Sequence, residues 1–153
     1  MSAHVQAFFI WKEDFNMKHI WNTIQAAFTA VGGAVGWFIG GLDGFLFALI
    51  AFVAVDYITG VLCAIEDKQL SSKVGFKGIA RKVLIFTLVG IGNILDTAVL
   101  KDGSAIRTAV IFFYLSNEGI SILENAAHLG LPIPKALKNM LEAINEEDKD
   151  ESE

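Results

Sequence analysis

Long apolar segments with few charged residues alternate with short polar segments along the chain. Four of the apolar segments are long enough to cross the roughly 30 Å hydrocarbon layer of a bilayer at about 1.5 Å of helix rise per residue. The pattern predicts an all-α integral membrane protein with about four transmembrane helices. The predicted spans are residues 20–42, 45–65, 83–100 and 108–129.

Polar and proline-containing segments predict the rest of the organisation. Pro132 and Pro134 end the last span, because proline cannot continue the backbone hydrogen bonds of a helix. Apolar residues then recur at helical spacing opposite polar ones, as in a short amphipathic helix on a membrane surface. The expected regions are an N-terminal cytoplasmic segment at 1–19, a transmembrane domain at 20–130, the amphipathic surface helix at 131–145 and an acidic, disordered tail at 146–153.

Composition supports the membrane class and excludes others. Hydrophobic residues make up 54% of the chain, which is more than a soluble domain usually holds, and only 19% of residues are charged. The net charge of −5 comes largely from the C-terminal tail, and no basic patch suggests a nucleic-acid partner. Cys63 is the single cysteine, so neither an internal disulfide nor a cysteine-rich metal site is possible. We expect no cofactor.

Basic residues predict the orientation in the membrane. They gather between the second and third spans, in a segment interpreted as a cytoplasmic loop from Glu66 to Lys82, because basic loops stay on the cytoplasmic side. The turn at residues 41–44 has no basic residue, and the third-to-fourth connection holds only Lys101 and Arg107. Four spans therefore predict two cytoplasmic termini. The residues of this cytoplasmic basic loop are Lys73, Lys77, Arg81 and Lys82, with Lys68 before them.

The first span contains Gly32, Gly36 and Gly40. Glycines four residues apart share one helix face and let another helix approach closely, which predicts a packing face. The alternative is a helix weakened by glycine that only dips into the membrane interface.

Asp56 lies near the middle of the second span, where a carboxylate costs roughly 2.5–3.5 kcal/mol on insertion scales. Twelve Leu, Ile, Val and Phe residues in that span offset the cost at roughly 0.3–0.6 kcal/mol each. Asp56, Thr59 and Gly60 form a narrow stripe that a partner helix can approach, and Asp56 is expected to pair with Arg81 or Lys82 or to stay protonated. Asp96 is expected near the exposed outer end of the third span.

A wider polar stripe follows the fourth span, which has only nine Leu, Ile, Val and Phe residues and is marginally apolar on its own. At 100° per residue its polar side chains occupy roughly a third of the helix circumference. Ionisable groups rarely face lipid, so the stripe is either a buried hydrogen-bonded seam between helices or a water-exposed pore lining. Its members are Tyr114, Asn117, Glu118, Ser121, Glu124, Asn125 and His128.

Catalytic chemistry finds little support in the sequence. Ser121, Glu124 and His128 supply triad residue types, but they lie within two turns of one helix and have no nucleophile elbow. The segment Asp56–Ala64 matches one fragment of the metal-binding pattern of membrane alcohol-phosphatidyltransferases, whose remaining aspartates are absent. We therefore expect no enzyme.

Three stretches stand out by their order and spacing, which cover roughly residues 45–141. The stretches are Asp56-Tyr57-Ile58-Thr59-Gly60 with Ala64; Ser71-Ser72 through Gly75, Gly78, Arg81 and Lys82; and Asn117-Glu118-Gly119-Ile120-Ser121-Ile122 with Glu124-Asn125, Gly130-Leu131-Pro132-Ile133-Pro134 and Leu137. Together they resemble a known family, the toxin-secretion and phage-lysis holins, which include clostridial toxin-export holins.

The resemblance implies a phage or prophage protein of the host cytoplasmic membrane that contacts lipid, assembles with copies of itself and opens pores or lesions. An endolysin (phage lysis) or a large toxin (toxin secretion) would be released through them. The alternative from the residues alone is a small membrane channel, a transporter subunit or a scaffold protein that uses the same polar stripes.

Overall fold

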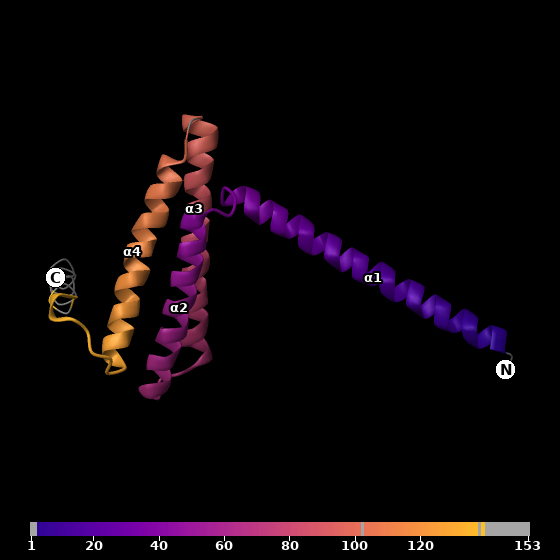
Figure 1. The fold of residues 1–153 in the computed structure, drawn as a ribbon, viewed down its shortest axis with the longest axis horizontal. Coiled ribbons are helices and arrows are strands. Elements are labelled where there is room, and N and C mark those ends of the chain that lie inside the picture. The colour runs from indigo at the N-terminus through magenta and orange to yellow at the C-terminus, as the bar shows by residue number, and fades with distance from the viewer. Residues whose placement is uncertain (1–2, 102, 138, 140–153) are drawn as a thin grey trace. The chain divides into compact units, whose positions relative to one another are not determined.

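The structure is a computed structural model that describes residues 3–101, 103–137 and 139, with side chains from residue 17 onward. The described part contains helices and no strand, which confirms the predicted all-α class. The chain divides into two units, Met1–Gly41 and Leu42–Glu153. The elements are α1 (Ala3–Phe38) in the first unit, and α2 (Gly44–Glu66), α3 (Ser72–Ile94), the π-helical segment η1 (Leu95–Leu100) and α4 (Ala105–His128) in the second (Figure 1).

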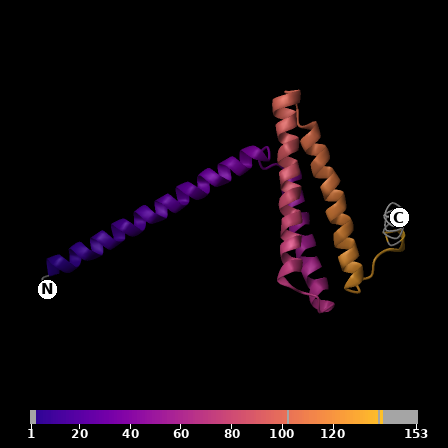
Figure 2. The ribbon, with the colours of Figure 1, turned by 180° about the vertical axis from the view of Figure 1, so that it is seen from behind.

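The second unit is a bundle of three long helices. Helix α3 continues through η1 without a break, and α4 packs along α2 and also against α3 (Figures 1 and 2). The connections at residues 67–71 and 101–104 are short, so successive helices run in opposite directions. The main difference from the predicted spans is the start of α3, which begins at Ser72 instead of residue 83. The other ends of the three helical segments lie within three residues of the predicted ones.

Side-chain caps fix where α2 and α3 begin. The Asp43 carboxylate accepts a hydrogen bond from the backbone N–H of Leu46 at 2.8 Å, and the Ser71 hydroxyl accepts one from Val74 at 3.3 Å. The predicted loop from Glu66 to Lys82 is therefore wrong, because α3 starts at Ser72. Four of its five basic residues lie on α3, where their positions in the sequence determine which side of the helix each one occupies.

Three segments of the described residues are long and apolar enough to cross a membrane, namely Gly44–Glu66, Ser72–Leu100 and Ala105–His128. Only 17% to 28% of their most apolar stretches is buried within the protein. The remaining surface is rich in exposed Phe, Leu, Ile and Val side chains, which suits contact with lipid. The second unit is thus a multi-pass membrane bundle with a small apolar core. That core consists of Leu46, Leu49, Val53, Ile85, Val89 and Ile111.

Helix α1 is not among these three segments, so the predicted count of four spans is not confirmed. Asn22, Thr23 and Gln25, together with the glycines, lower its average apolarity. The predicted span 20–42 also ends too late, because α1 ends at Phe38.

The predicted glycine face needs correction at Gly40. This residue follows the end of α1 and has a φ of 84°, a left-handed conformation that glycine adopts without strain, so it does not share a helix face with Gly32 and Gly36. A Cβ added at Gly32 or Gly36 would meet no atom within 4 Å. Close packing at these two glycines against another helix, in the same chain or in a neighbouring copy, therefore remains a prediction.

The predicted surface helix at 131–145 falls largely outside the described residues. Residues 135–137 and 139 are helical, and the Leu137 N–H donates to the Pro134 carbonyl at 3.0 Å. Residues 138 and 140–153, which include the predicted acidic tail, lie outside the description.

Candidate functional site

A charged cluster lies between the three helices of the bundle. The Lys82 ammonium group of α3 contacts Asp56 of α2, at 2.5 Å from Oδ2, and also Glu118 Oε2 of α4. The side chains of these residues are only 13%, 11% and 6% exposed, respectively. Two carboxylates sharing one ammonium leave one formal negative charge, held away from lipid by the bundle. Lys82 is one of the two partners expected for Asp56.

Asn125 extends the cluster by about two turns toward the C-terminal end of α4. Its side-chain amide donates to Asp56 Oδ1 at 3.3 Å and to the Thr59 hydroxyl at 2.9 Å. The Cys63 thiol lies 3.5 Å from the Asn125 carbonyl, within reach of a weak hydrogen bond. A neutral amide thus satisfies acceptors of α2 without adding charge. In the described part, no buried side-chain nitrogen or oxygen lacks a hydrogen-bond partner.

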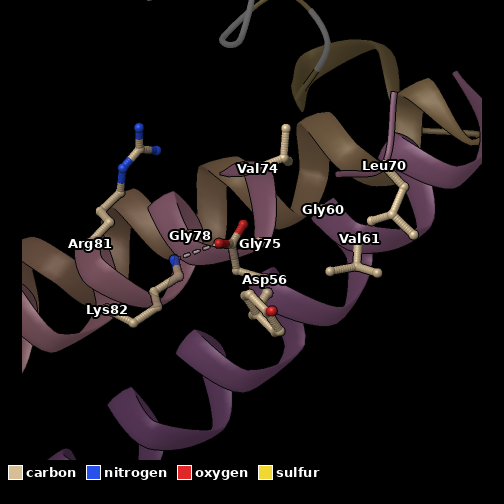
Figure 3. A pocket seen from close by; sticks show the side chains of 10 residues that line it. Asp56, Gly60, Val61, Leu70, Val74, Gly75, Gly78, Arg81 and Lys82 are labelled. Atoms are coloured by element: carbon tan, nitrogen blue, oxygen red, sulfur yellow. Dashed lines mark hydrogen bonds and ion pairs between the residues drawn. The ribbon is translucent and has the colours of Figure 1, made fainter. Parts of the chain in front are cut away.

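Small residues let α3 approach α2 beside this cluster. A Cβ added at Gly78 would lie 3.2 Å from the Tyr57 ring, and one at Gly75 would lie 3.7 Å from the Tyr57 hydroxyl. The two glycines therefore accommodate the tyrosine. A pocket of about 160 Å³ opens here, and Figure 3 shows Lys82 pointing into it toward Asp56 while Arg81 points away.

A second polar network joins the helix ends nearest the 101–104 connection. Arg107 is 3% exposed, and its guanidinium donates to Asp43 Oδ2 at 2.6 Å. Asp96 of η1 is 1% exposed and accepts from the backbone N–H groups of Ile106 and Arg107 at 3.0 and 2.8 Å. Asp96 therefore caps the first turn of α4, and these bonds fix the ends of three elements together.

Sequence reasoning missed this network. Asp96 was expected to be exposed and Arg107 to lie in a loop, but both are buried because Asp96 satisfies the free N–H groups of α4 and Arg107 neutralises Asp43. The Arg107 guanidinium, followed by the Leu46 N–H, lowers the pKa of Asp43 below its ordinary value of 3.8. The one available signal was Asp43, an N-cap residue type directly before an apolar run.

The polar stripe of α4 does not act as a single surface. Glu118 and Asn125 point toward α2 and Lys82, whereas His128 at the end of the helix pairs with Asp67 of the 67–71 connection at 3.0 Å. Glu124 is half-buried. The remaining stripe residues line a groove of about 360 Å³ between α3 and α4. These are Tyr114, Asn117 and Ser121, which share the groove with Arg81, Leu84 and Leu88.

The predicted basic residues also separate. Lys82 points into the bundle, while Lys73, Lys77 and Arg81 are exposed. Gly60 of the second-helix stripe faces α4, because a Cβ added at this glycine would lie 3.8 Å from the side-chain amide nitrogen of Asn125. Among the described residues, no three His, Cys, Asp or Glu side chains are grouped as a metal site would require.

Comparison with known sequences now bears on this arrangement of spanning helices and buried charge. Residues 33–146 match the bacteriophage holin family. The chain belongs to this family. Relatives of this holin-family protein include an uncharacterized 14.9 kDa protein of the nagH 3' region of Clostridium perfringens, 39% identical over 84% of this chain and 98% of its own length.

Two further relatives widen the comparison. An uncharacterized protein of Listeria innocua is 43% identical over 80% of this chain and 86% of its own length. A protein of Bacillus phage phi105, named "Probable holin", is 34% identical over 71% of this chain and 80% of its own length. No solved structure matches this holin-family chain. The matched range contains all three segments that are apolar enough to span a membrane.

Proposed function

We propose that this protein is a non-enzymatic holin of the bacterial host cytoplasmic membrane, which assembles with copies of itself and opens pores or lesions. An endolysin or a large toxin crosses the membrane through them. The family membership supports the class of function. The observation that carries the mechanism is the Lys82 cluster, because it places charged groups inside a bundle whose outer surface is apolar.

In the closed protomer the cluster removes charges from contact with lipid. A carboxylate in the hydrocarbon layer costs several kcal/mol unless a partner or water compensates it. Lys82 and Asn125 provide that compensation within one chain, so a single bundle is stable in the membrane with its polar groups turned inward.

Assembly changes which partner is available to α4. In a group of protomers, α4 can turn its stripe toward neighbouring stripes or toward a shared aqueous opening, where water solvates Glu118 in place of Lys82. The polar groups that hold the closed bundle together would then line the opening. The stripe thereby serves as a packing seam in the closed state and as a lining in the open state.

Expression in a bacterium with and without a cytoplasmic endolysin tests the function. A holin stops growth abruptly, and culture turbidity collapses only when the active endolysin is present. The matched control is an endolysin variant that lacks activity. A small channel, transporter subunit or scaffold protein would release no enzyme-sized cargo, so retention of the endolysin inside intact cells at full expression would refute the proposal.

Glu118→Leu tests the role of the stripe. This variant leaves Lys82 paired with Asp56, so we expect normal insertion and accumulation but loss of lysis, and Glu118→Gln should keep part of the activity. Ser116→Leu is the control, since Ser116 is exposed on the same helix and bonds only the Phe112 carbonyl. Lysis of Glu118→Leu at the wild-type time, at matched protein levels in the membrane, would show that Glu118 has no part in opening.

A further inference from the structure

We infer that the groove between α3 and α4 binds one anionic phospholipid, with its phosphate held by Lys77 and Arg81. Lipid binding at this site goes beyond the proposed pore formation, and it is measured without lysis. Of the outward basic residues of α3, Arg81 lines the groove and Lys77 lies about one turn before it on the same helix face, whereas the Lys82 cluster lies at the inner wall of the groove.

The face of α3 changes from cationic to apolar within one turn. At 100° per residue, Lys73, Lys77 and Arg81 fall within about 80° of the helix circumference, and Leu84 and Leu88 fall inside the same sector further along. All five side chains are exposed. This is the arrangement of a phospholipid, whose charged headgroup is followed by an acyl chain that runs toward the middle of the bilayer.

Charge complementarity selects an anionic headgroup. No acidic residue occurs between Ser71 and Leu95, and the structure gives Lys73, Lys77 and Arg81 no ion pair with a carboxylate of the described residues. Asp56 and Glu118 also line the groove, but they are 8% and 5% exposed, and Lys82 already contacts both. The accessible charge at the rim is therefore positive.

Helix α4 supplies polar groups at the depth of the lipid ester bonds. Lys82 touches Glu118, so these two residues mark one level, and Asn117 and Ser121 of the groove lie within about one turn of it. The Asn117 amide and the Ser121 hydroxyl can donate to ester carbonyls, which only accept hydrogen bonds. Leu84 and Leu88 then contact the acyl chain. The groove of about 360 Å³ thus presents a cationic group, hydrogen-bond donors and apolar side chains, which are the groups that an anionic phospholipid requires.

Lipid retention by the purified full-length chain in detergent tests this site. Phosphatidylglycerol or phosphatidylcholine is added in equal amounts, and the bound lipid is measured by mass spectrometry of the intact complex. We expect phosphatidylglycerol to bind in preference. Arg81→Gln and Lys77→Gln should each weaken that binding about five-fold, because each basic residue near an anionic surface contributes about that factor.

Two controls separate a specific site from general attraction. Lys68→Asn removes one exposed positive charge from the connection before α3, outside the groove, and should leave phosphatidylglycerol binding unchanged. Leu88→Trp keeps all charges but fills the groove, and should reduce binding of the lipid while leaving binding of inorganic phosphate unaffected. Equal retention of the two lipids, or an equal effect of Lys68→Asn and Arg81→Gln, would overturn the inference. Helical content by circular dichroism identifies a misfolded variant, and then Lys77→Gln decides alone.

Discussion

Removing the Lys82 ammonium group should destabilise the bundle more than removing either carboxylate. In Lys82→Met the Asp56 and Glu118 carboxylates lose their shared partner. Both contact one nitrogen in the wild type, so their oxygens are within about 5 Å of each other. At an effective dielectric constant of about 20, their repulsion is about 3 kcal/mol.

Loss of a partner from a buried ion pair typically costs about 3–5 kcal/mol in total, and we expect that range for Lys82→Met. Glu118→Gln keeps an acceptor for Lys82 and leaves the Asp56 pair intact, so it should cost about 1–2 kcal/mol. The triple variant Asp56→Asn, Lys82→Met, Glu118→Gln carries no buried charge in the cluster. It should recover at least half of the loss, because neutral replacement of a buried ion group is often tolerated.

Unfolding in mixed micelles, followed by far-UV circular dichroism, measures the free energy of unfolding of each variant. Ser116→Leu serves as the control for a substitution on the lipid-facing side of the bundle. Two results would refute the view that uncompensated charge dominates the energetics of this cluster. One is a smaller loss of stability for Lys82→Met than for Glu118→Gln. The other is a triple variant that is less stable than Lys82→Met.

Three further predictions concern the helix ends and α1. The pKa of Asp43 is lower in the folded state, so its contact with Arg107 stabilises the fold above pH 3.8 and is lost as the pH falls further. The Tm of the wild type should therefore drop below pH 3.8, whereas the Tm of Asp43→Asn should change less. Gly92→Ala should cost about 1–3 kcal/mol in unfolding experiments, because its Cβ would lie 3.0 Å from the Arg107 Cα. The uncharged residues 20–38 of α1 form a helix about 28 Å long, which is enough for a fourth span. With four spans, reporter fusions should place both termini in the cytoplasm. An N-terminus accessible from outside would limit the chain to three spans.

The sequence by itself determined the class of the protein and the position of three spans. Membrane insertion depends on the summed apolarity of a continuous segment, so the run around Asp56 was identifiable despite its central carboxylate. The same local reasoning was less reliable at segment ends. A charged stretch such as 72–82 was interpreted as a loop, although the Ser71 cap and the four-residue spacing of Lys73, Lys77 and Arg81 are compatible with a helix.

Only the tertiary structure decided how the polar residues are paired. The sequence offered Arg81 or Lys82 to Asp56, and the rotation of α3 against α2 selects Lys82 and turns Arg81 outward (Figure 3). Glu118 joins them because α4 packs beside both helices. The bond from Arg107 to Asp43 depends on the same packing, since these residues are 64 positions apart. Hydrophobic insertion is a local sum along the chain, whereas an ion pair requires the relative rotation and depth of two helices, which no single segment encodes.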